Sequence, residues 1–80
     1  MKNQTNDDTT LAQLPIGKEA KVLSIQENGA ISKRLMEMGV VPGVSVRVVK
    51  TAPFGDPIEI RIRNYSLALR RSEAQSIRVK

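Results

Sequence analysis

The side chains that could carry chemistry in this 80-residue chain are 13 lysines and arginines and 8 acids. The chain contains no histidine and no cysteine. The commonest general base and the thiolate nucleophile are therefore absent. Two of the acids, Asp7 and Asp8, are adjacent near the N-terminus, and no spacing among the others brings two carboxylates together in a cleft. Because a nucleophile, a base and an orienting group cannot be assembled, the sequence predicts no enzyme and no catalytic residue.

Metal and cofactor sites are limited by the same two missing residue types. Without histidine or cysteine, a metal site would need clustered carboxylates, which suit Mg²⁺ and Ca²⁺ better than a first-row transition metal. The glycine-containing stretch "GVVPG" at residues 39–43 has no lysine and lacks the strand–loop–helix context of a phosphate-binding loop. We therefore expect no cofactor and no tight metal site.

The net charge of +5 and the pI of about 10.1 favour an anionic partner, which could be nucleic acid, an acidic protein surface or the cytoplasmic leaflet. The alternative is that arginine and lysine simply occupy solvent-facing strand positions. Arg47, Arg61 and Arg63 would form a nucleic-acid-binding face if they converge, but Phe54 and Tyr65 are the only rings available for base stacking. A basic nucleic-acid-binding barrel is therefore the alternative function, with strongly salt-dependent binding.

The only phenylalanine, Phe54, lies in a turn between Pro53 and Gly55. It either folds back over the core or is exposed for a partner, and Met36, beside the apolar stripe of a predicted helix, has the same two interpretations. Exposed Phe and Met are typical interface anchors. The predicted partner-binding residues are Met36, Phe54, Pro53, Leu35, Arg47 and Arg61. Leu35 is also expected in the core, so a substitution there would affect folding as well as binding.

These residues must be positioned by a small set of elements. Residues 1–10 are polar and predict a disordered lead, so the domain is expected at residues 11–80. Residues 18–27 predict a strand whose alternation slips, as at a β-bulge. Residues 28–39 change to helical spacing, with Ile31, Leu35 and Met38 on one face and Gly39 as the helix-ending residue.

The second half of the chain alternates apolar and polar residues. This pattern predicts strands at residues 44–49, 58–63 and 67–70 and a short final strand at 77–79, whereas residues 71–76 allow a single helical turn. About five strands and one short helix favour a mostly β fold, a small antiparallel barrel. Closure of the barrel would remove open strand edges. The predicted core consists of Val22, Ile31, Leu35, Val46, Val48, Ile58, Ile60, Ile62, Leu67, Leu69 and Ile77.

The stretch "SKRLMEMGVVPGVSVRVVKTAPFGDPIEIRIRNYSLALRRSEAQSIRV" resembles the ferrous iron transport protein A family, FeoA. The matching elements are a short helix ending at Gly39, then Pro42-Gly43, Ala52-Pro53, Gly55-Asp56-Pro57 and Leu67-Ala68-Leu69-Arg70. The order and spacing of these elements carry the resemblance, which covers residues 11–80. One departure is Asn64, where the family has a glycine in the turn after the isoleucine strand; asparagine tolerates a left-handed conformation.

The resemblance implies an SH3-like barrel in a family associated with transition metal ion binding. It implies a non-enzymatic cytosolic accessory or regulator of ferrous iron uptake that binds the membrane transporter FeoB. In this interpretation Phe54 occupies a variable position of a turn shaped by Gly55-Asp56-Pro57, so it is expected at the surface. The N-terminus lacks the apolar segment of a secretory signal, and no apolar run is long enough to cross a membrane. We therefore expect a cytoplasmic protein without membrane insertion; its oligomeric state is open, since short terminal strands can swap between chains.

Overall fold

The computed structural model describes residues 9–26 and 29–80. In chain order the elements are β1 (Thr9–Thr10), the 3₁₀ helix η2 (Leu11–Gln13), β2 (Glu19–Ile25), α1 (Ala30–Glu37), β3 (Ser45–Thr51), β4 (Ile58–Ile62), β5 (Tyr65–Leu69), α2 (Arg71–Gln75) and β6 (Ile77–Val79). The strands form one antiparallel sheet in the order β1-β6-β2-β3-β4-β5. The mostly β architecture is confirmed, with six strands in the described residues instead of about five.

The additional strand, β1, corrects the predicted domain boundary. Thr9 and Thr10 pair with Val79 and Arg78 of β6, so the expected disorder of residues 9 and 10 is wrong. The remainder of the predicted lead, residues 1–8, lies outside the described residues.

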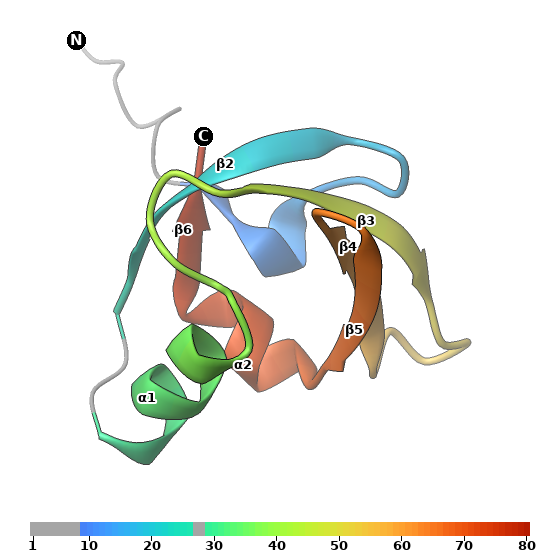
Figure 1. The fold of residues 1–80 in the computed structure, drawn as a ribbon. Coiled ribbons are helices and arrows are strands. Elements are labelled where there is room, and N and C mark those ends of the chain that lie inside the picture. The colour runs from blue at the N-terminus through green and yellow to red at the C-terminus, as the bar shows by residue number, and fades with distance from the viewer. Residues whose placement is uncertain (1–8, 27–28) are drawn as a thin grey trace, which may run out of the picture.

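The sheet curls into a barrel-like wall, with β6 and β2 on one side and β4 and β5 on the other (Figure 1). Helix α2 lies below the opening of the barrel and packs against η2. Among the described residues β5 pairs only with β4, and β1 pairs only with β6. The expectation that closure removes every strand edge is therefore wrong at β5.

The isoleucines of β4 have the predicted register. Ile58, Ile60 and Ile62 are buried and face the core, while Arg61 is exposed and Glu59 is half-buried on the other face. The slip predicted in β2 is also confirmed, because the pairing of β2 with β6 shifts register between Val22 and Ser24.

Helix α1 ends as the sequence predicts. Gly39 adopts a positive φ of 97°; its N–H donates to the carbonyl of Met36, and the N–H of Val40 donates to the carbonyl of Leu35, at 3.0 Å each. These two bonds form a Schellman motif, which satisfies helix carbonyls that lack intrahelical donors. The motif also turns the chain inward, so that Val40 is fully buried.

The predicted core residues are all buried except Ile31 and Leu67, which are partly buried and packed against the core. The core also contains residues that the prediction omitted, namely Leu11, Ala20, Val40, Val44, Ala74 and Val79. Most of these lie in short elements or connections, where too few residues are present for a periodic pattern to develop.

Candidate partner-binding surfaces

The Phe54 side chain is 97% exposed. This position confirms that Phe54 is a surface residue and removes the alternative that it folds over the core. Because the hydrophobic effect favours burial of a phenylalanine ring, folding alone does not explain why the ring is held in water. An unburied ring of this size is available to a partner.

The connection that carries Phe54 is tied down on both sides. The N–H of Gly55 donates to the carbonyl of Ala52 at 2.7 Å, and Gly55 has a positive φ of 83°. The Oδ1 atom of Asp56 accepts a hydrogen bond of 2.9 Å from the backbone N–H of Arg71, in the first turn of α2. Asp56 therefore supplies a partner to an N–H that has none within the helix, a long-range role that the sequence did not reveal.

A hollow of about 330 Å³ lies beside this connection. It is lined by Lys50, Thr51, Ala52, Pro53, Pro57, Glu59 and Ala68. The Nζ atom of Lys50 lies 3.7 Å from Oε1 of Glu59, so the charged residues of the wall pair with each other. Pro53 is thus an exposed part of an apolar wall next to Phe54, as a partner-binding residue requires.

The helix α1 presents a second, separate surface. Met36 is 50% exposed, whereas Leu35 is fully buried. The prediction that Leu35 belongs to the binding surface is therefore wrong, because its side chain faces the core. Figure 1 shows α1 and the connection between β3 and β4 on opposite sides of the molecule, so Met36 and Phe54 do not form one patch.

A third surface contains the predicted arginines. Arg47 of β3 and Arg61 of β4 are cross-strand partners, and both are exposed. Together with Arg63 they line a hollow of about 260 Å³, to which Glu19 also contributes. The Nη2 atom of Arg47 lies 3.5 Å from Oε1 of Glu19, and both side chains are more than half exposed. The three arginines therefore converge, as the nucleic-acid alternative requires, with one carboxylate among them.

The turn after β4 forms, but the residue with the left-handed backbone conformation is not Asn64. Arg63 and Asn64 connect the paired residues Ile62 and Tyr65. The residue with a left-handed φ, 55°, is Arg63. The backbone strain in this turn is thus carried one residue earlier than the resemblance implied.

The side chains available to hold a transition metal are few. In the ranges 9–26 and 29–80, no group of three or more His, Cys, Asp or Glu residues is placed to hold a metal ion. Within the same ranges, no helix is long and apolar enough to span a bilayer.

Comparison with known proteins identifies the family. Residues 9–80 match the family model described as the FeoA domain. The chain belongs to the FeoA family. A FeoA-like protein from Clostridium acetobutylicum has a similar solved structure, with a TM-score of 0.85, 38% identity, and coverage of 92% of this chain and 86% of that one. The FeoA of Stenotrophomonas maltophilia, solved as a complex with zinc and described as a procaryotic SH3 domain protein, has a TM-score of 0.81, 39% identity, and coverage of 90% and 89%. The SH3-like fold is thereby established.

A curated relative links the FeoA domain to a transporter. The Fe(2+) transport protein A/Fe(2+) transporter FeoB fusion protein of Porphyromonas gingivalis is 39% identical over 70 residues. The match covers 88% of this chain but 8% of the fusion protein. In that relative, a FeoA-type domain and the transporter are one polypeptide.

Proposed function

We propose that this chain is a non-enzymatic cytosolic accessory of ferrous iron uptake that binds a FeoB-type membrane transporter on its cytoplasmic side. The observation that carries the proposal is the Porphyromonas gingivalis fusion, in which a similar domain is covalently joined to FeoB. Covalent linkage raises the effective concentration of one part at the other, and it is useful when the two parts act together. In this account ferrous iron is the cargo of the transporter and not a ligand of this chain.

Phe54 is the proposed principal anchor. It is exposed, it projects from a connection that hydrogen bonds hold to α2, and it lies beside an apolar hollow that includes Pro53. A preorganised aromatic residue loses little conformational entropy on binding. Met36 on α1 is a second anchor that a partner would reach only by wrapping around the barrel or through a separate contact.

Arg47 and Arg61 would act mainly on the rate of encounter. Both are exposed on the outer face of the sheet. Charges of this kind accelerate association with an acidic surface more than they increase affinity. Binding to the transporter should therefore slow on addition of salt.

Nucleic acid binding is the second candidate, favoured by the convergence of Arg47, Arg61 and Arg63 at one hollow. The two rings do not support it. Phe54 lies in the connection between β3 and β4, and the hydroxyl of Tyr65 donates a hydrogen bond to the carbonyl of Met38. Neither ring lines the arginine hollow. A gel shift with single-stranded oligonucleotides at two salt concentrations separates the candidates, because a retarded band that disappears at the higher concentration would favour nucleic acid.

Co-purification tests the proposed function. The tagged chain should retain the FeoB-type transporter from detergent-solubilised membranes, and a Phe54→Ala chain should retain less of it. GTP hydrolysis by the transporter, measured with and without the chain, would then show whether binding is regulatory. Failure of the wild-type chain to retain the transporter would overturn the proposal.

A further inference from the structure

Strand β5 has one free backbone edge. It pairs with β4, and among the described residues no strand pairs with its other side. The backbone hydrogen bonds made outside the regular elements involve none of its five residues. The opposite edge of the sheet is β1, which has two residues. Such a short edge offers little to pair with, so β5 is the longer template.

The register shows which backbone groups point outward. Ile62 and Tyr65 flank a two-residue turn and are paired. In such a hairpin the flanking residues exchange both of their hydrogen bonds, and the pairs then alternate along the ladder. Ser66 and Ala68 therefore occupy the non-bonded positions, and their N–H and C=O groups point away from β4. Both residues are exposed.

Nothing in β5 protects this edge. Its sequence, YSLAL, contains no charged residue and no proline. Its pairing with β4 contains no bulge. Natural proteins usually block exposed edges with such features to prevent unwanted strand pairing. An unprotected edge of this length is typical of a surface that another strand occupies.

Charge indicates the kind of strand that fits. Arg63 lies two residues before the start of β5, and Arg70 and Arg71 directly follow its end. On the outer face, Arg61 lies opposite Ser66. The edge is thus bounded by arginines at both ends. An antiparallel pairing with β5 of a second copy would bring Arg63 of one chain toward Arg70 of the other, and like charges placed together across strands are destabilising.

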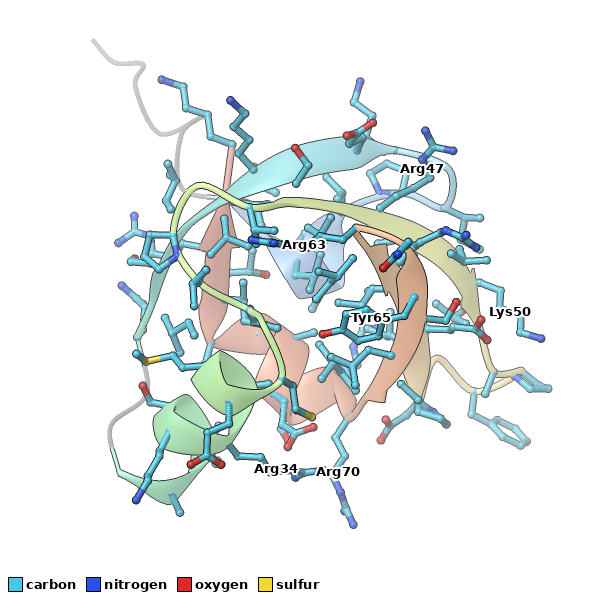
Figure 2. All side chains as sticks on the ribbon, viewed as in Figure 1. Arg34, Arg47, Lys50, Arg63, Tyr65 and Arg70 are labelled. Carbon is cyan, nitrogen blue, oxygen red and sulfur yellow. The ribbon has the colours of Figure 1, made fainter. Side chains whose placement is uncertain are left out.

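The inner side of the edge is apolar. Tyr65 and Leu67 face the same side as the buried Leu69 but are only partly covered. Figure 2 shows Tyr65 pointing from β5 across the open side of the barrel, toward the segment that follows α1. An added strand would therefore meet apolar side chains on its inward face and arginines near its ends.

We propose that the free edge of β5 binds an extended, acidic segment of a partner protein by β-strand addition. Main-chain hydrogen bonds from Ser66 and Ala68 give affinity, and the flanking arginines select acidic side chains. This inference rests on the proposed function in one respect, because it assigns the segment to the cytoplasmic part of the FeoB-type transporter.

The test compares two substitutions at one position. Ala68→Pro removes an outward-pointing N–H and adds a ring to the free edge, while the bonds between β4 and β5 stay intact, since proline is tolerated where an edge N–H faces solvent. Ala68→Ser changes the side chain and keeps the N–H. Against the cytoplasmic part of the transporter, Ala68→Pro should weaken binding at least about tenfold more than Ala68→Ser does, because only the proline variant lacks the N–H.

If Ala68→Pro does not fold, amide hydrogen exchange of the wild-type chain tests the same proposal. The amides of Ser66 and Ala68 should exchange fast in the free protein and at least about tenfold more slowly in the complex. Arg63→Glu should weaken binding, and an unchanged affinity would contradict the acidic character of the segment.

The outcomes separate this inference from the proposed function. If the wild-type chain binds the transporter while Ala68→Pro binds equally well and both amides stay unprotected, strand addition is overturned and the proposed function stands. If the wild-type chain does not bind, the proposed function and the assigned partner both fail. Dimerisation that protects the same two amides without any partner would identify a second copy as the occupant and overturn the acidic segment.

Discussion

The guanidinium of Arg34 in α1 lies 2.7 Å from the carboxylate of Glu73 in α2. These residues are 39 positions apart in the sequence, and their pairing joins the two helices. Glu73 is 4% exposed, and its other carboxylate oxygen accepts the backbone N–H of Arg70 at 2.9 Å. Each oxygen of the buried carboxylate therefore has a hydrogen-bond donor, as a buried charge requires.

Replacing Arg34 tests this linkage. Arg34→Met leaves the Glu73 carboxylate buried without its guanidinium, and we expect a loss of about 1–3 kcal/mol in the free energy of unfolding. Urea unfolding followed by circular dichroism measures the loss.

Arg47→Met is the matched control, since it breaks the longer Arg47–Glu19 pair, both of whose members are mostly exposed. Exposed pairs contribute about 0–1 kcal/mol. Equal losses for the two variants would show that the Arg34–Glu73 pair is no more important than a surface pair.

Ile60→Ala tests the register of the sheet. Ile60 is fully buried, so its truncation should cost about 2–5 kcal/mol in the free energy of unfolding. The same substitution at Ile16, which is 61% exposed, should stay within about 0.5 kcal/mol. If thermal melting placed both variants close to the wild type, the inward face of β4 would be misassigned.

The periodic parts of this fold were predictable from the sequence. The alternation of Ile58, Ile60 and Ile62 with charged residues determined the face of β4, and the helical spacing of Ile31, Leu35 and Met38 determined that of α1. Both patterns are long enough for burial on one face to leave a periodic signal.

Short elements and long-range contacts were not predictable in the same way. Leu11 and Ala74 are buried in η2 and α2, elements of three and five residues, which are too short to display a period. The bond from Arg71 to Asp56 depends on how two distant turns meet. The free edge of β5 depends on strand order, which a local pattern does not contain.

The candidate site was predictable in part. The position of Phe54 in a glycine-proline turn indicated exposure, and the structure confirms it. The sequence predicts two positions for Leu35: its spacing with Ile31 and Met38 places it in the core, and its adjacency to Met36 places it on the binding surface. Its burial assigns it to the core.

Titration of the isolated chain with Fe²⁺ tests the expectation that it has no tight metal site. Since the chain has no histidine or cysteine, we expect no sub-micromolar site in anaerobic calorimetry. A saturable sub-micromolar isotherm would contradict this expectation and would point to carboxylate ligands.

Phe54→Ala separates folding from binding. Because the ring is almost fully exposed, its removal should change the free energy of unfolding by less than about 0.5 kcal/mol. Loss of an interface anchor should reduce transporter affinity by at least about 1–2 kcal/mol. Both quantities are measured on the same variant, with Ile16→Ala as an exposed apolar control. A normal melt with undiminished binding would remove Phe54 from the interface.

The most direct test of the central claim is a calorimetric titration of the wild-type chain into the purified cytoplasmic part of a FeoB-type transporter. If this chain acts by binding the transporter, the titration gives a saturable isotherm whose affinity is reduced by Phe54→Ala and retained by Ile16→Ala. The absence of any saturable heat, with a chain that still melts cooperatively, would contradict the claim that this protein acts by binding the transporter.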